Sequence, residues 1–178
     1  MYKRQTHTAL DNSYKGVSAR ICDVLGLKNK KILIPKKGFE KESSSKNSFE
    51  NVGMGMIGEL PTELNEKDFL LFLKKTMKTQ CVRHSNFINK KIKRVAVLGG
   101  AGSFAIETAI QSKADVYVSS DFKYHDFFKA ENSILLADIG HYESEQFTKN
   151  LLVEFLTKKF TNFAIVLSEK STNPIYYL

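Results

Sequence analysis

The stretch LLADIGHYESE, residues 135–145, joins an apolar, strand-like run to the start of a helix. The run ends at Gly140, and His141 and Glu145 follow with a spacing of four residues. Because residues i and i+4 share one helical face, this spacing places an imidazole and a carboxylate one turn apart. At the end of a buried strand, such a pair can bind a divalent metal ion. The alternative is an ordinary helix start, where acidic side chains favour the helix dipole.

The second half of the chain alternates between strand-like and helix-like patterns. We expect strands over residues 94–98, 115–119, 133–137 and 163–167, and helices over 103–112, 123–130 and 141–158. Upstream we expect helices over 13–25 and 64–78, strands over 31–35, 52–60 and 81–84, and near the end an extended piece over 175–178. The pattern predicts an α/β fold with a largely parallel or mixed sheet and helices on both faces.

The composition excludes several classes of protein. The formal net charge is +8, but only four of the 27 basic residues are arginines and the lysines are scattered, which favours a solvated surface over nucleic-acid binding. No apolar run is long enough to span a membrane, and the first six residues are not a secretory signal. Cys22 and Cys81 have no C-x-x-C spacing, which favours a reducing compartment and predicts a cytoplasmic protein.

Ligands of open α/β sheets bind beyond the carboxyl ends of the strands. Three predicted strands end there in polar or glycine-rich loops, at residues 99–103, 119–125 and 138–141. The first loop, Gly99-Gly100-Ala101-Gly102-Ser103, suits a nucleotide phosphate, with Asp121 in place for a ribose. It lacks the third glycine of dinucleotide-binding loops, so a tight turn that needs glycine is the favoured interpretation.

Two further histidines are candidates for proton transfer. His125 follows Asp121 by four residues at the same predicted edge, and it is either a general acid or base or an ordinary surface histidine. His7 and Asp11 are also four apart, near the start of the chain. Asp11 and the residues after it suit the cap of the next helix equally well, so both interpretations stay open.

The order of these motifs resembles the NIF-three-like proteins, the dinuclear-metal-centre hexameric family often labelled GTP cyclohydrolase I type two. The matching segments are residues 6–11, 16–27, 53–60, 95–103, 115–125 and 140–145. The resemblance implies two divalent metal ions, Zn, Mn or Fe, with three ligands in this chain: Asp11, His141 and the bridging Glu145. It further implies that His125 or His7 transfers a proton, in a cavity lined by Asp121, Tyr124 and Tyr142.

The chain departs from the family pattern in three ways. Family members carry a histidine pair upstream of the first motif, whereas this chain begins almost at that motif. We therefore expect a truncated NIF-three-like fold that lacks its N-terminal strands and helices and holds one metal ion or none. Residues 1–5 are expected to be a foreign leader and 6–178 a single domain, with 38–51 a linker where longer relatives carry an inserted domain. Met56 stands where relatives usually have arginine.

By this resemblance the protein is a metal-dependent, hydrolase-like homohexamer, a trimer of dimers, acting on a small molecule through an activated water. Neither nucleic acid nor a membrane is an expected partner. One alternative is a non-catalytic regulatory or interaction module with a vestigial metal site. The other is a nucleotide-binding domain that uses the glycine turn at residues 99–103.

Overall fold

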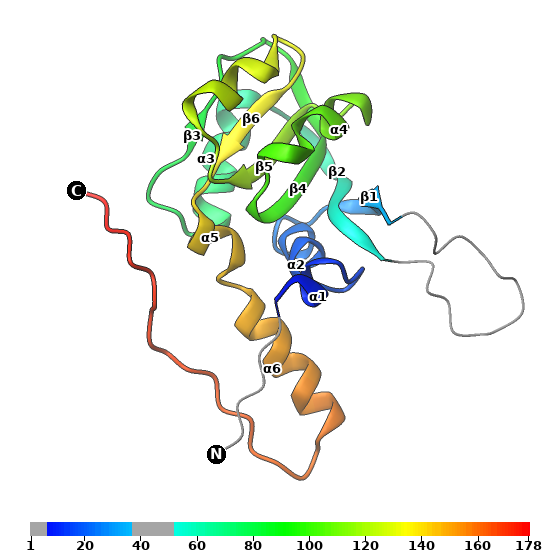
Figure 1. Cartoon of the computed structure of the whole chain (residues 1–178), viewed down its shortest axis with the longest axis vertical. Helices are drawn as coiled ribbons and strands as arrows, with labels where there is room; N and C mark the ends of the chain where they lie inside the picture. Colours follow the sequence, from blue (N-terminus) through cyan, green and yellow to red (C-terminus); the bar gives the residue numbers. More distant parts are fainter. Residues whose placement is uncertain (1–6, 37–51) are drawn as a thin grey trace, which may run out of the picture.

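The computed structural model describes residues 7–36 and 52–178, whose strands form a six-stranded mixed sheet (Figure 1). The strands are β1 Lys28–Pro35, β2 Gly53–Asn65, β3 Arg83–His84, β4 Lys91–Ala101, β5 Val116–Ser120 and β6 Leu135–Asp138. They lie in the order β1-β2-β4-β5-β6-β3. The predicted α/β class is thus confirmed, with strands close to the expected positions.

Parallel pairing is confined to the centre of the sheet. β4 pairs in parallel with β5, and β5 with β6, whereas β1–β2, β2–β4 and β3–β6 are antiparallel. The parallel register sets Val95 opposite Val116, and Val116 opposite Leu135. The carboxyl ends of β4, β5 and β6 therefore meet at one edge, as the alternation of strand and helix predicted.

Helices cover both faces of the sheet. They are α1 Thr8–Asp11, α2 Val17–Val24, α3 Glu66–Thr76, the 3-10 helix η1 Ser103–Ala105, α4 Ile106–Gln111, the 3-10 helix η2 Tyr124–Ala130, α5 His141–Glu145 and α6 Thr148–Lys159. α2 and α3 pack on one face, and α4 and η2 on the other. The expectation of a two-sided cover is confirmed.

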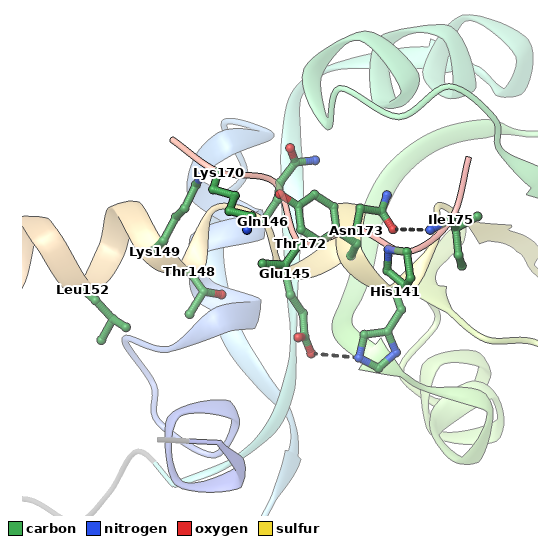
Figure 2. Close-up of a pocket in the computed structure, with 12 residues that line it drawn as sticks. His141, Glu145, Gln146, Thr148, Lys149, Leu152, Lys170, Thr172, Asn173 and Ile175 are labelled. Carbon is green, nitrogen blue, oxygen red and sulfur yellow. Dashed lines mark hydrogen bonds and ion pairs between the residues drawn. The ribbon is translucent and has the colours of Figure 1, made fainter. Parts of the chain in front are cut away.

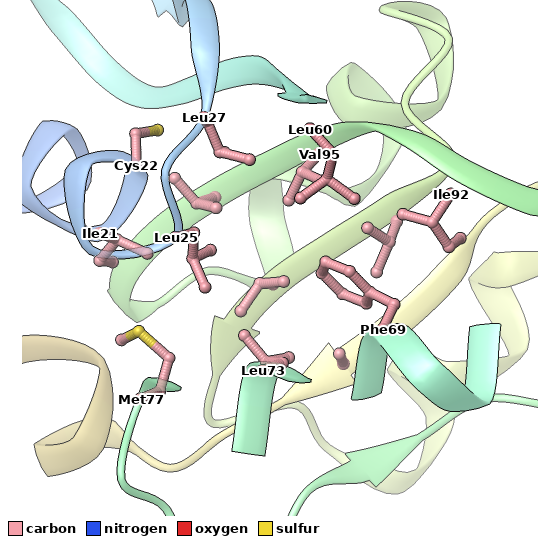
Figure 3. Packing of buried hydrophobic residues seen from close by; sticks show 14 of the residues in the cluster. Ile21, Cys22, Leu25, Leu27, Leu60, Phe69, Leu73, Met77, Ile92 and Val95 are labelled. Atoms are coloured by element: carbon pink, nitrogen blue, oxygen red, sulfur yellow. The ribbon is translucent and has the colours of Figure 1, made fainter. Parts of the chain in front are cut away.

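The two cores follow from the alternation of side chains along a strand. On β4, Val95 and Val97 enter the core under α2 and α3, where they meet residues such as Ile21 and Phe69 (Figure 3). Ala96 and Leu98 enter the second core, beneath α4. Because β4 is buried on both faces, its sequence is continuously apolar from Val95 to Leu98, the pattern typical of a central parallel strand.

The predicted strand over residues 163–167 is wrong. The chain from residue 160 to 178 contains no helix or strand, and the Val166 side chain is 86% exposed. The apolar run has β propensity, but a strand also needs an open sheet edge. The edge beside β6 is already taken by β3, which pairs Arg83 with Asp138 and His84 with Ala137.

The other predicted helices and strands are shifted or divided. The helix expected over 141–158 is broken at Gln146 and Phe147 into α5 and α6. The segment expected as a helix over 123–130 is a 3-10 helix. β2 continues to Asn65, so α3 begins at Glu66, later than expected.

Two predicted segments, residues 1–5 and 38–51, lie outside the described residues. In the part of the chain that the structure describes, no helix has both the length and the apolar content needed to cross a membrane.

Candidate functional site

His141 is the first residue of α5, just beyond the carboxyl end of β6. Gly140 precedes it with φ of +90°, a value that side-chain-bearing residues rarely adopt. The Gly140 amide donates to Oδ1 of Asp138 at 3.0 Å, so the turn is tied to the end of the strand. This short turn directs the chain from the buried strand into α5 and brings His141 to the edge where β5 also ends.

Asp121 orients the ring of His141. Asp121 directly follows β5, and Nδ1 of His141 donates to its Oδ2 at 2.6 Å. This hydrogen bond is the largest cause that raises the pKa of His141, and the nearby carboxylates Glu145 and Asp11 raise it further. With Nδ1 engaged, Nε2 is the ring nitrogen left for a ligand, an arrangement typical of metal-binding histidines.

Glu145 faces the free side of the imidazole. Its Oε1 lies 3.6 Å from Nε2 of His141, as the i,i+4 spacing predicted (Figure 2). Burial raises the pKa of Glu145, and the His141 charge partly offsets that rise. Together the two side chains present one nitrogen and one oxygen donor to the same small volume.

The glycine-rich end of β4 closes over this pair. Gly100 has φ of +75°, and a Cβ there would lie 2.7 Å from Oε1 of Glu145. Its amide donates to Oγ of Ser144 at 2.8 Å, and its carbonyl accepts from Ser119 and Ser120. This end of the strand thus approaches the site closely, and glycine at this position is a steric requirement.

The amides of the three glycines in this segment have partners within the protein. Besides the Gly100 amide, that of Gly99 donates to Oγ of Ser18 at 3.4 Å, and that of Gly102 to the Ser120 carbonyl at 3.3 Å. A phosphate cradle needs such amides free. The geometry therefore favours a backbone role for these glycines over a nucleotide-binding one, but Gly99 and Gly100 lie in the irregular end of β4 and not in a separate turn.

Asp11 and His7 lie within electrostatic reach of the pair. Asp11 is half-buried at the end of α1, and burial raises its pKa, while the charges of His7 and His141 lower it. Glu145 also interacts with both. Within residues 7–36 and 52–178, however, no three His, Cys, Asp or Glu side chains are grouped tightly enough to hold a metal ion. Folding therefore brings the predicted ligands near one another without assembling a closed three-ligand site.

His125 and Tyr124 lie on η2 in an exposed aromatic cluster. The ring centroids of Tyr124 and His125 are 5.2 Å apart, and Phe128 packs against both. Among the described residues, neither ring makes a hydrogen bond or ring contact with His141 or Glu145. Tyr142 is half-buried beside the pair, and its hydroxyl accepts from Ser171 at 3.4 Å. Of the proposed cavity residues, Asp121 and Tyr142 adjoin His141, whereas Tyr124 and His125 form a separate group.

A pocket of about 520 Å³ opens beside His141 and Glu145. Its walls are α5, the start of α6 and the C-terminal segment over residues 170–175 (Figure 2). Asn173 anchors that segment, because its Nδ2 donates to Oε1 of the buried Glu143 at 3.1 Å. Lys149 and Lys170 also line the pocket, and neither was among the site residues expected from the sequence. No local pattern marks them, since the pocket arises from packing between distant segments.

Solved structures of other proteins have a fold similar to that of this chain. Staphylococcus aureus protein SA1388 superposes with a TM-score of 0.85 and 27% sequence identity, over 97% of this chain and 68% of that one. The Bacillus cereus protein related to NIF3 has the same TM-score at 20% identity, over 97% of this chain and 72% of its own, which shows the fold alone.

Sequence comparison gives the family. A Staphylococcus aureus (strain MRSA252) protein named GTP cyclohydrolase 1 type 2 homolog is 32% identical over 130 residues, which are 71% of this chain and 36% of the relative. The chain thus spans little more than a third of that relative. The family model described as Duf34/NIF3 (NGG1p interacting factor 3) matches residues 5–174, so the chain belongs to this family, as its motifs predicted.

Proposed function

We propose that this protein is a divalent-metal-binding, hydrolase-like member of its family, with His141 and Glu145 as the centre of the metal site. The observation that carries the proposal is the chain of contacts from Asp121 to Nδ1 of His141, and from Nε2 to Oε1 of Glu145. A carboxylate that fixes the tautomer and orientation of a histidine is a recurring feature of metal sites.

The donor set fits the proposed metal ions. An imidazole nitrogen with carboxylate oxygens suits Zn, Mn or Fe. Asp11 is the third donor in this proposal, because it is half-buried and its charge interacts with His141 and Glu145. Among the described residues the three are not grouped closely enough to hold a metal ion, so Asp11 would have to approach the pair when the ion binds. Three donors would then leave coordination positions open, as hydrolytic sites require.

The side chains have distinct roles in this proposal. A divalent ion bound there would supply Lewis-acid activation of water and of a substrate oxygen. His141 and Glu145 hold the ion, and Asp121 keeps the imidazole in the tautomer that exposes Nε2. His7 is the better candidate than His125 for moving a proton, because its charge interacts with Asp11 and Glu145.

The proposal also includes the oligomeric state and the cellular location of the protein. The homohexamer and the cytoplasmic location expected from the sequence accompany the family assignment and are part of what we propose. The name GTP cyclohydrolase 1 type 2 homolog belongs to the relatives. The donor set supports a hydrolytic class of reaction without selecting a guanine nucleotide as its substrate.

Metal analysis of the purified protein tests the proposal. After equilibration with Zn²⁺, Mn²⁺ or Fe²⁺ and removal of free ion, we expect bound metal in the wild type. The His141→Ala and Glu145→Gln variants should lose it, because each removes one of the two facing donors. Retention of metal by both variants, when circular dichroism shows that they are folded, would contradict the proposed site.

Matched controls come from outside the cluster. His84 is exposed and stacks on Phe87, with ring centroids 4.9 Å apart, and Glu107 is exposed on α4. The His84→Ala and Glu107→Gln variants remove the same donor types, and we expect wild-type metal content in both. Loss of metal in the controls would show nonspecific binding by surface side chains.

A further inference from the structure

Basic side chains outnumber acidic ones in the pocket beside the His141–Glu145 pair. Among its lining residues, Glu145 is the carboxylate, while Lys149 and Lys170 each contribute an ammonium group. In Figure 2 both lysines lie on the side of the pocket away from His141. The pocket therefore has a donor pair for a cation at one end and a positive region at the other.

The two ammonium groups are held differently. Nζ of Lys149 donates to the Ser168 carbonyl at 3.1 Å, which positions it and leaves two of its three N–H groups for a ligand. Lys170 makes no hydrogen bond or ion pair with another described residue. Among residues 7–36 and 52–178 no carboxylate forms an ion pair with either lysine, so an anion entering the pocket would meet two charges without a counterion from this part of the chain.

The start of α6 adds a second, independent signal. Thr148 is one of the residues that line this pocket, and its buried Oγ1 has no hydrogen-bond partner among the described residues. A buried polar atom without a partner is uncommon and costs stability unless a ligand or water satisfies it. Thr148 is also the first residue of this 12-residue helix, and no side chain caps the helix at Phe147. The free amide groups and the dipole at this end favour negative charge.

We infer that the pocket binds a small molecule carrying a phosphate group, which lies between Lys149, Lys170 and the first turn of α6. A volume of about 520 Å³ suits a small organic ligand. Leu152 and Ile175 supply apolar wall for the organic part. The inference rests on the proposed function in one respect: a phosphate held there directs the adjoining part of the ligand towards His141 and Glu145.

Phosphate binding to chelator-treated, metal-free protein tests the inference separately from the metal. Titration with inorganic phosphate, followed by calorimetry or amide NMR shifts, should give saturable binding in the wild type. The Lys149→Gln/Lys170→Gln variant should bind about tenfold more weakly or worse, because it loses two charge-assisted contacts. The Lys149→Arg/Lys170→Arg variant should bind more tightly than the glutamine variant, because it keeps both charges.

Lys67 and Lys113 are exposed lysines outside the pocket, so the Lys67→Gln/Lys113→Gln variant is the control for net charge and should bind like the wild type. Phenyl phosphate separates the two sources of the group. Tighter binding than inorganic phosphate identifies an ester, and equal binding identifies free phosphate as a sufficient ligand.

Absence of saturable phosphate binding, or equal affinity in the glutamine and control variants, would overturn the inference. Metal analysis of separate samples, equilibrated with Zn²⁺, Mn²⁺ or Fe²⁺, keeps the two hypotheses distinguishable. Phosphate binding that depends on the lysines, together with no retained metal in the equilibrated samples, would refute only the proposed function. Bound metal without phosphate binding would refute only the phosphate site.

Discussion

Nδ1 of His141 lies 2.6 Å from Oδ2 of Asp121, although the two residues follow different strands of the sheet. The contact exists because β5 and β6 are parallel neighbours that end at the same edge. It holds the imidazole in one orientation and directs Nε2 towards Glu145. The candidate site is thus organised by the topology of the sheet as well as by the i,i+4 spacing in α5.

Replacing Asp121 tests this relationship directly. The Asp121→Asn variant should lower the pKa of His141 towards its ordinary value, because the hydrogen bond to a carboxylate is the largest cause of the rise. Metal affinity should fall by about 10- to 100-fold. NMR titration of the imidazole and equilibrium dialysis measure the two effects. The Asp68→Asn variant, an exposed acid on α3, should change neither; an unaltered His141 pKa in Asp121→Asn would refute the role of Asp121.

The free energy of unfolding of the metal-free protein should depend on pH through the titration of His141. A pKa raised in the folded state means that the folded protein binds this proton more tightly than the unfolded chain. The stabilising contribution is fully present below the unfolded pKa and is lost as pH rises through the folded one. Denaturant unfolding at several pH values, compared between wild type and His141→Gln, should show a stability difference that shrinks with rising pH. A difference that grows with pH would contradict the assigned direction.

Two features require glycine at position 100: the positive φ of its backbone and the closeness of the Glu145 side chain. A Cβ at Gly100 would lie 2.7 Å from Oε1 of Glu145, whereas one at Gly26, with φ of +69°, meets nothing within 4 Å. Each alanine variant should lose about 1–2 kcal/mol from left-handed backbone strain. Only Gly100→Ala should also displace Glu145 and weaken metal binding. Equal metal affinity in the two variants, measured by equilibrium dialysis, would show that Glu145 is free to move without consequence.

Asp138 stabilises the edge of the sheet on which the site is built. Its buried carboxylate accepts from the Phe122 amide at 3.0 Å, the Gly140 amide at 3.0 Å and the Arg83 guanidinium. The Asp138→Ala variant leaves these donors without their acceptor and should lower the free energy of unfolding by about 3 kcal/mol. Denaturant unfolding measures this loss. The matched surface change Asp68→Ala should cost far less, and a similar loss in both would contradict a special role for Asp138.

The two cysteines should differ sharply in reactivity. Burial raises the pKa of Cys22 to about 12, whereas Cys81 is exposed. Because the thiolate is the reactive form, one thiol should react with a chromogenic disulfide in the native protein, and both after denaturation. The Cys81→Ser variant should be unreactive until it is unfolded. Rapid labelling of that variant in its native state would show that the α2 core opens readily.

The features that could be predicted from the sequence are those that arise between residues close together along the chain. The strand–helix alternation, the two-sided burial of β4 and the facing of His141 by Glu145 all follow from periods of two and 3.6 residues along one segment. The motifs also identified the family. The strand expected over residues 163–167 failed because its propensity is local, whereas the position of β3 beside β6 is decided elsewhere in the chain.

The sequence by itself determined the α/β class, the edge of the sheet that gathers polar residues and the His141–Glu145 pair. Tertiary structure alone decided that Asp121 orients His141 and that Lys149 and Lys170 share a pocket. The physical reason is that hydrogen bonding within one helix or turn follows from spacing along the chain. Contacts between residues 20 or more positions apart depend instead on strand order, the packing of α6 and the path of the C-terminal segment.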